Sequence, residues 1–326
     1  MDVFIGPQFY SSFERNPLTL VDVGAGGGLL SLWRKATRWL RVIAFEPDDR
    51  EFKNLTREEH SYPVHYCPTA LCDVQSSQTQ LYLTSKQELS SMFRPNRRFL
   101  DRFPESERFD IEDRVTVDSD TLDVQLMAMG APEVDFLKID AQGGALSVLQ
   151  GARGTLLGSV FGIELEVELV PMYEKQPLFA DVDRFLSQAG FMLFDFRPYY
   201  WKRSNGMEFG GTKGQLIMAD VLYLKKTEKF AGSLKANDDK SRSKLLRAIS
   251  ICLLYGYFDY ALELVDEAGE TITPSDSSTL RQCIQKQGRN SWMRIVVGRI
   301  RRSVRVLLES AHKGWALARG VLGNLD

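Results

Sequence analysis

The sequence is poor in the features that mark secreted, disulfide-bonded or membrane-spanning proteins. It has four cysteines in 326 residues and no C-x-x-C pair. This usage disfavours a disulfide framework and favours buried or free thiols in a reducing compartment. No apolar run is long and uncharged enough to span a bilayer, and Met1 is not followed by the basic and then apolar stretch of a signal peptide. These absences predict a cytoplasmic protein.

An excess of charge of either sign is also missing. The 41 basic and 43 acidic residues leave a formal net charge of −2 at pH 7. The molecule as a whole is therefore not a generic polyanion binder, and nucleic acid is not an expected partner. Its apolar fraction of 44% is that of a soluble globular protein, and its length suffices for one full α/β domain with an appendage.

The most informative stretch is a glycine-rich segment after the first apolar run. Residues 18–23 read as a strand, and glycines follow at 24, 26 and 28. The next apolar run, 41–45, ends in Glu46. Strand, glycine turn, helix, strand and terminal acid form half of a Rossmann nucleotide site. Glu46 is placed to accept hydrogen bonds from both ribose hydroxyls.

The spacing of the glycines indicates which nucleotide is bound. A dinucleotide site with G-x-G-x-x-G would need glycine at position 29, which is Leu29. The acid-x-G-x-G-x-G form led by Asp22 is used for S-adenosylmethionine, because a carboxylate suits its cationic groups and would repel a diphosphate. A nicotinamide-dependent oxidoreductase is kept as an alternative. The residues predicted to contact the cofactor here are Asp22, Gly24, Ala25, Gly26, Gly28, Glu46 and Pro47.

Strand-type runs alternate with helical patterns over the first two thirds of the chain. Such alternation predicts an α/β fold with a mostly parallel sheet covered on both faces. Strands are expected at 18–23, 42–45, 64–71, 135–139, 161–167, 191–196 and 221–224, and helices at 29–38, 48–57, 145–157 and 180–189.

Candidate catalytic residues follow two of these strands. The run 136–139 ends in Asp140, which is expected beside the transferred methyl as a base or as a group that only positions the cofactor. Gln142 orients an acceptor hydroxyl or stabilises the turn. Alternation along 163–168 puts Glu166 and Glu168 on one strand face near the crevice, where they would bind acceptor hydroxyls, act as base or hold a divalent metal. Salt bridges to a covering helix are the structural alternative.

Several ordered motifs resemble the FkbM-type methyltransferase family. They are the Lys138-Ile-Asp-Ala-Gln-Gly-Gly box, the 162–173 stretch, Phe45-Glu-Pro47, the Ala70-Leu71 step and Ser90-Ser-Met92. The resemblance spans about residues 18–225. It implies the class I methyltransferase fold, a Rossmann-like doubly wound sheet of seven strands whose last strand runs antiparallel between its neighbours. It also implies S-adenosylmethionine and O-methyl transfer to hydroxyls of sugars or natural products.

The same resemblance assigns backbone contacts with adenine to Ala70 and Leu71, at the end of the third strand. One position departs from the family pattern, because Ala145 stands where the family box usually has Glu. The lost carboxylate motivates a second alternative, a non-catalytic protein that binds S-adenosylmethionine or docks on a membrane.

The composition changes after Leu224. We expect a methyltransferase domain at 1–226, a charged linker at 227–243 and an all-helical C-terminal region at 244–326. The last helix, 291–322, carries an apolar stripe with arginines on its other faces. A basic amphipathic helix of this kind can lie on the inner face of a membrane, or dock on the preceding helices or on a partner chain.

Overall fold

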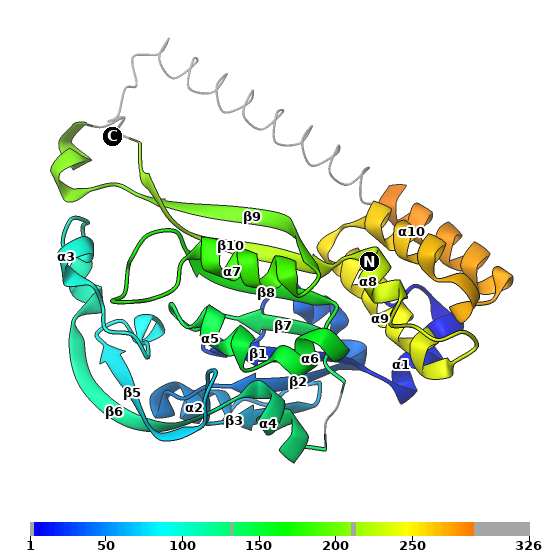
Figure 1. Cartoon of the computed structure of the whole chain (residues 1–326), viewed down its shortest axis with the longest axis horizontal. Helices are drawn as coiled ribbons and strands as arrows, with labels where there is room; N and C mark the ends of the chain where they lie inside the picture. Colours follow the sequence, from blue (N-terminus) through cyan, green and yellow to red (C-terminus); the bar gives the residue numbers. More distant parts are fainter. Residues whose placement is uncertain (1–2, 131–132, 210–212, 290–326) are drawn as a thin grey trace, which may run out of the picture.

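A seven-stranded sheet organises the protein. The computed structural model describes residues 3–130, 133–209 and 213–289 (Figure 1). The strand order is β3-β2-β1-β7-β8-β10-β9, and β10 runs antiparallel to both of its neighbours. This topology confirms the predicted doubly wound sheet and the antiparallel last strand. The strands are β1 (Leu18–Val23), β2 (Leu40–Phe45), β3 (Val64–Cys67), β7 (Phe136–Ile139), β8 (Gly162–Glu168), β9 (Phe191–Trp201) and β10 (Gln215–Lys225).

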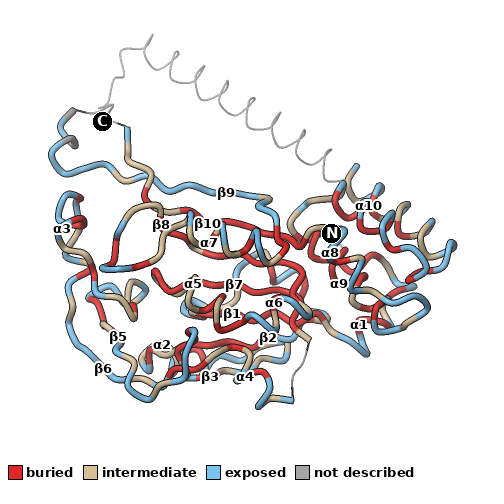
Figure 2. The backbone as a smooth tube through the Cα atoms, in the orientation of Figure 1, coloured by how far each residue is buried: buried red, intermediate tan, exposed pale blue. Residues whose placement is uncertain are grey.

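Helices cover both faces of this sheet, and the central strands β1, β2, β7 and β8 are almost wholly buried, whereas the edge strands β3 and β9 are more exposed (Figure 2). Successive side chains of a strand point to opposite faces, so the central strands supply two separate apolar clusters. One cluster packs against α4 (Leu122–Ala128), α5 (Ala145–Gln150), α6 (Arg153–Gly158) and α7 (Phe179–Gln188). The other packs against α1 (Tyr10–Arg15), α2 (Asp49–Leu55), α9 (Asp239–Tyr255) and α10 (Phe258–Glu267).

The helices after the sheet gather with α1 at one end of the molecule (Figure 1). The segment expected as a linker, 227–243, contains α8 (Thr227–Ala231) and the start of α9. Apolar side chains of α9 share one core with β1 and β2. The guanidinium Nε of Arg247 in α9 donates to Asp135 Oδ1 at 2.7 Å, and both side chains are buried. These helices are thus packed against the sheet.

Residues 274–289 form a further helix that begins at Pro274. The predicted basic helix 291–322 lies outside the described residues. Within the described part of the chain, no helix has the length and apolar character needed to cross a bilayer.

A second, three-stranded sheet is a feature that the sequence did not predict. Its order is β4-β6-β5, with β4 at Ala70–Leu71, β5 at Ser76–Thr84 and β6 at Ile111–Asp120. The expected strand 64–71 was wrong as one element: it breaks after Cys67, because Pro68 has no N–H for a strand ladder. Between β5 and β6 the chain forms η3 (Gln87–Leu89), α3 (Arg97–Leu100) and η4 (Ser106–Phe109).

The element after the glycine loop also differs from the prediction. An α-helix was expected at 29–38, but the structure has a 3₁₀-helix, η2, at Trp33–Trp39. The buried Trp33 and Ala36 are three residues apart, which matches the 3₁₀ period. The remaining short helices are η1 (Pro7–Phe9), η5 (Ser204–Phe209) and η6 (Gly269–Thr271).

Candidate functional site

The glycine loop lies at the carboxyl end of β1 and contacts two neighbouring strand ends. The amides of Gly24 and Ala25 both donate to the Phe45 carbonyl, at 3.0 and 3.2 Å. A Cβ on Gly24 would lie 1.8 Å from the carbonyl oxygen of Asp140, so no larger residue fits there. Its φ of +69° also favours glycine. The loop therefore lies directly against the turn that carries Asp140.

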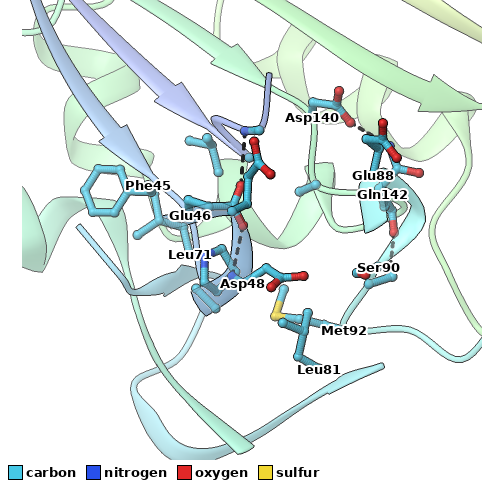
Figure 3. A pocket seen from close by; sticks show the side chains of 18 of the residues that line it. Phe45, Glu46, Asp48, Leu71, Leu81, Glu88, Ser90, Met92, Asp140 and Gln142 are labelled. Atoms are coloured by element: carbon cyan, nitrogen blue, oxygen red, sulfur yellow. Dashed lines mark hydrogen bonds between the residues drawn. The ribbon is translucent and has the colours of Figure 1, made fainter. Parts of the chain in front are cut away.

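A cavity opens beside this loop, and Glu46 faces it (Figure 3). The Glu46 carboxylate accepts from the Gly26 amide at 3.1 Å through Oε2 and from the Asp48 amide at 2.9 Å through Oε1. Glu46 is only 8% exposed. Burial raises the pKa of Glu46 to about 7, and the charges of Asp48 and Glu51 add to this effect. The acid is thus fixed in the cavity with lone pairs left to accept further hydrogen bonds.

An apolar slot adjoins Glu46. Phe45, Leu71, Leu81 and Met92 give it carbon and sulfur surface (Figure 3). Pro47 and Ala70 also line the cavity. Ala70 and Leu71 were expected at the end of the third strand; they belong instead to β4 in the second sheet, and still reach the cavity.

Asp22, which the sequence predicts to meet the cofactor, forms an ion pair next to the glycine loop. Asp22 lies outside the cavity lining and is 3% exposed, with its Oδ1 at 3.1 Å from the Nζ of Lys138 on β7. The same ammonium donates to the Gly24 carbonyl at 2.7 Å. Because β1 and β7 are parallel neighbours in register at these two residues, the pair supports the glycine loop from beneath. Ala25 and Gly28 likewise lie outside the cavity lining.

Asp140, Gln142 and Glu166 come together in one hydrogen-bonded group. The Gln142 amide nitrogen donates to Asp140 Oδ1 at 2.7 Å and to Glu166 Oε1 at 2.9 Å. Its amide oxygen accepts from the Tyr173 hydroxyl at 3.0 Å, and its carbonyl accepts from Ser91 Oγ at 2.6 Å. Gln142 and Asp140 line the cavity on the side opposite Glu46 (Figure 3). Gln142 thus links the cavity to the carboxyl end of β8.

Glu166 and Glu168 do not line the cavity as expected. Glu166 is half-buried and reaches the cavity only through Gln142. Burial, reinforced by the charges of Asp140 and Glu168, raises the pKa of Glu166 well above its ordinary value. Glu168 is 3% exposed and accepts a hydrogen bond from the Gly143 backbone, and burial raises its pKa to about 7.

The third acid of this strand, Glu164, has partners from two other elements. It forms an ion pair with Arg197 of β9, and the Tyr255 hydroxyl of α9 donates to its Oε2 at 2.6 Å. The alternative of a salt bridge thus holds for Glu164, although its cation comes from a strand. Among the residues that the structure describes, no group of three or more His, Cys, Asp or Glu is arranged to hold a metal ion. A metal at Glu166 and Glu168 therefore has no support.

Glu51, Gln87 and Ser91 also belong to the site, and the sequence analysis assigned them no role. Glu51 and Gln87 line the cavity, and Ser91 both lines it and bonds Gln142. Gln87 and Ser91 come from the segment between β5 and β6, which reaches the site only because the second sheet forms. The family motif Ser90-Ser-Met92 was the one signal in the sequence that pointed to this segment.

Comparison with known proteins agrees with this geometry. Residues 22–193, just over half of the chain, match the Methyltransferase FkbM domain. The chain belongs to the FkbM methyltransferase family. Membership in this family implies S-adenosylmethionine as the methyl donor, the cofactor that the glycine loop predicts. None of the proteins with curated descriptions matches the sequence of this FkbM-family protein.

Solved methyltransferase structures are similar to it at low sequence identity. One is methyltransferase FkbM from Methylobacillus flagellatus KT, with 15% identity, a TM-score of 0.33 and coverage of 63% of this chain. This chain spans only 43% of that protein. Magnesium protoporphyrin IX methyltransferase (ChlM) from Synechocystis PCC 6803, solved with bound SAM, shows 10% identity and a TM-score of 0.32, over 67% of this chain and 74% of that one. Precorrin-6y C5,15-methyltransferase from Geobacter metallireducens GS-15 shows 13% identity and a TM-score of 0.31, over 67% and 87%.

Proposed function

We propose that the protein is an S-adenosylmethionine-dependent O-methyltransferase whose acceptor is a hydroxyl of a saccharide or secondary metabolite. The observation that carries this proposal is the arrangement of polar side chains in one cavity. Glu46 lies on one side of the cavity, and Asp140 and Gln142 lie on the opposite side. One side suits a ribose diol, and the other suits a hydroxyl that must lose a proton. Family membership supplies the methyl donor.

The residues around the cavity fit an adenosyl group. Glu46 offers free lone pairs to two ribose hydroxyls, and Phe45, Leu71 and Met92 offer apolar surface to a base. The space over Gly27 and Gly28 is open, and the backbone at Gly24 and Gly26 lines the cavity. When bound, S-adenosylmethionine supplies a methyl group on a positively charged sulfur.

On the acceptor side, we assign Asp140, which lines the cavity, as the base, and Gln142 and Glu166 as positioning groups. Gln142 holds Glu166 and Asp140 through a single amide, so the acceptor hydroxyl would be held by groups in fixed relative positions. The nearby carboxylates favour a neutral polyhydroxylated acceptor and disfavour a polyanion.

The oxidoreductase alternative fits the glycine loop poorly. Dinucleotide sites bind pyrophosphate with free loop amides and the N-terminus of the helix that follows. Here the Gly26 and Gly27 amides donate to Glu46 and Glu51, and the loop is followed by a short 3₁₀-helix. The non-catalytic alternative rests on Ala145, which is buried in the core at the start of α5.

Two measurements test the proposal. Thermal shift with S-adenosylhomocysteine and with NADH should show stabilisation by S-adenosylhomocysteine, and stabilisation by NADH alone would overturn the assignment. Transfer of a labelled methyl group should then be followed over a panel of glycans and polyhydroxylated natural products, with Asp140→Asn as the impaired control. Cofactor binding without transfer to any acceptor would favour the non-catalytic alternative.

Peripheral membrane contact through residues 291–322 remains a separate proposal. It is supported by the arginines and the apolar stripe of that stretch. Sedimentation of the protein with anionic lipid vesicles, compared with a chain that ends at residue 289, tests it; equal sedimentation of the two would refute it.

A further inference from the structure

A second carboxylate, that of Glu51, lies against the glycine loop. Glu51 is in the first turn of α2, and its Oε1 accepts from the Gly27 amide at 3.2 Å. Its Oε2 accepts from Gln87 Nε2 at 2.9 Å, on the segment between β5 and β6. The side chain also packs on the loop backbone, since a Cβ on Gly26 would lie 3.5 Å from its Cγ. Glu51 is therefore held in place from two sides while it lines the cavity.

Two successive amides of the loop are thus occupied by carboxylates. Gly26 donates to Glu46 and Gly27 donates to Glu51. In loops that bind phosphate, amides in these positions point freely at the anion and supply most of its hydrogen bonds. An amide that already donates to a carboxylate is not available, and the carboxylate adds a repulsive charge.

We propose that Glu51 is a specificity-determining residue that rejects adenosine nucleotides with a phosphate on C5′ and admits adenosyl ligands without one. This inference rests on the proposed function, because it requires that the cavity hold an adenosyl group. Cells contain adenosine nucleotides that share the adenine and ribose of the cofactor. Glu46 and the apolar slot recognise only those shared parts, so selection must come from the groups near C5′. Glu51 provides that selection by charge.

Gln87 holds the carboxylate of Glu51 in position. It donates to Glu51 from η3, and Arg50 Nη2 donates to Ser90 Oγ of the same segment at 3.4 Å. Without Gln87, the Glu51 side chain could rotate toward solvent and away from the loop amide. Gln87→Met should therefore weaken the discrimination in the same direction as a change at position 51, by a smaller factor.

The test compares S-adenosylhomocysteine with ADP by isothermal titration calorimetry. Glu51→Gln removes the charge and keeps an amide oxygen for Gly27, whereas Glu51→Ala removes both. We expect ADP affinity to rise about tenfold in Glu51→Gln and further in Glu51→Ala, with S-adenosylhomocysteine affinity changed less than about threefold. Asp49→Asn is the matched control, because it removes one exposed charge from the same helical turn; it should leave both affinities unchanged.

The outcomes separate this inference from the proposed function. If wild-type protein binds S-adenosylhomocysteine and Glu51→Ala gains no ADP affinity, the inference is overturned and the proposed function stands. Loss of S-adenosylhomocysteine binding in Glu51→Gln also overturns it, since Glu51 would then be a ligand of the cofactor. If the wild-type protein does not bind S-adenosylhomocysteine, the proposed function fails and the inference fails with it.

Discussion

Replacement of Glu46 by glutamine should remove a pH dependence of the free energy of unfolding and should weaken binding of the ribose. Burial raises the pKa of Glu46 from 4.5 to about 7. In the folded state the group therefore binds its proton more tightly than in the unfolded chain. Its contribution to stability is fully present below pH 4.5 and is lost as pH rises through about 7.

The size of this effect follows from the difference between the two pKa values. A difference of about 2.5 units corresponds to about 3 kcal/mol at 1.36 kcal/mol per unit. The unfolding free energy of Glu46→Gln, minus that of the wild type, should increase by about this amount between pH 4 and pH 8. Because a difference between pH values is used, the hydrogen bond that glutamine cannot make to Gly26 or Asp48 cancels.

Urea denaturation at four pH values between 4 and 8 measures this difference. Glu168, which also has a raised pKa of about 7, titrates in both proteins and is removed by the subtraction. Glu59→Gln, at an exposed position, is the control, and its free energy of unfolding should change with pH as that of the wild type does. A difference that stays constant over the pH range would refute the reasoning, because Glu46 would then titrate alike in the folded and unfolded chain.

The binding half of this prediction uses 5′-methylthioadenosine, which keeps the adenine and ribose but has no amino acid group that titrates. The ionised carboxylate is the better acceptor for two hydroxyls. Wild-type affinity should therefore rise by about tenfold from pH 6 to pH 8, since the ionised fraction rises by that factor around a pKa of about 7. Glu46→Gln should bind more weakly, by about 2 kcal/mol, and show no such rise. A rise of equal size in the variant would assign the titration to another group.

Three further changes test other parts of the structure. Gly24→Ala should abolish S-adenosylhomocysteine binding in calorimetry, because the added Cβ would lie 1.8 Å from the Asp140 carbonyl; binding within threefold of wild type would contradict the loop geometry. Asp140→Asn should lower kcat by about 100-fold and should flatten the rise of kcat with pH, as expected for loss of a general base; an unchanged pH profile would assign the base elsewhere. Arg247→Met should cost about 3 kcal/mol or more in urea denaturation, because it leaves Asp135 buried without its cation; Lys240→Met, at an exposed partner of Glu133, is the control and should cost less than about 1 kcal/mol.

Local patterns in the sequence predicted those parts of the site that lie at strand ends. Glu46 and Asp140 each follow an apolar run directly, and parallel strands bring their carboxyl ends to one edge of the sheet. The glycine loop was predicted in the same way, because its regularly spaced glycines directly follow the apolar run of β1. The ion pair of Asp22 was not predictable, because its partner, Lys138, is distant in sequence and becomes its neighbour only through the β1–β7 register.

Residues that reach the site from outside these strand ends were not predictable in this way. Gln87 and Ser91 depend on a second sheet, and that sheet depends on a break at Pro68 that the apolar pattern of 64–71 concealed. The role of Gln142 required tertiary information as well, since an amide at a turn gives no sign in the sequence that it bonds Asp140, Glu166 and Tyr173 together.

The helices after the sheet are part of the same physical unit as the site. The Tyr255 hydroxyl, at the end of α9, accepts from Trp33 Nε1 at 3.2 Å and donates to Glu164. The Tyr255 ring stacks on the ring of Phe136, with 5.3 Å between the ring centroids. Trp33 begins the element that follows the glycine loop, and Glu164 lies two residues before Glu166 on β8. The hydroxyl of Tyr255 thus links the element that follows the glycine loop, on the cofactor side, to strand β8, on the acceptor side. Because these bonds are partly buried and α9 shares its core with β1 and β2, the geometry of the site depends on residues that the sequence pattern had placed in a separate helical region.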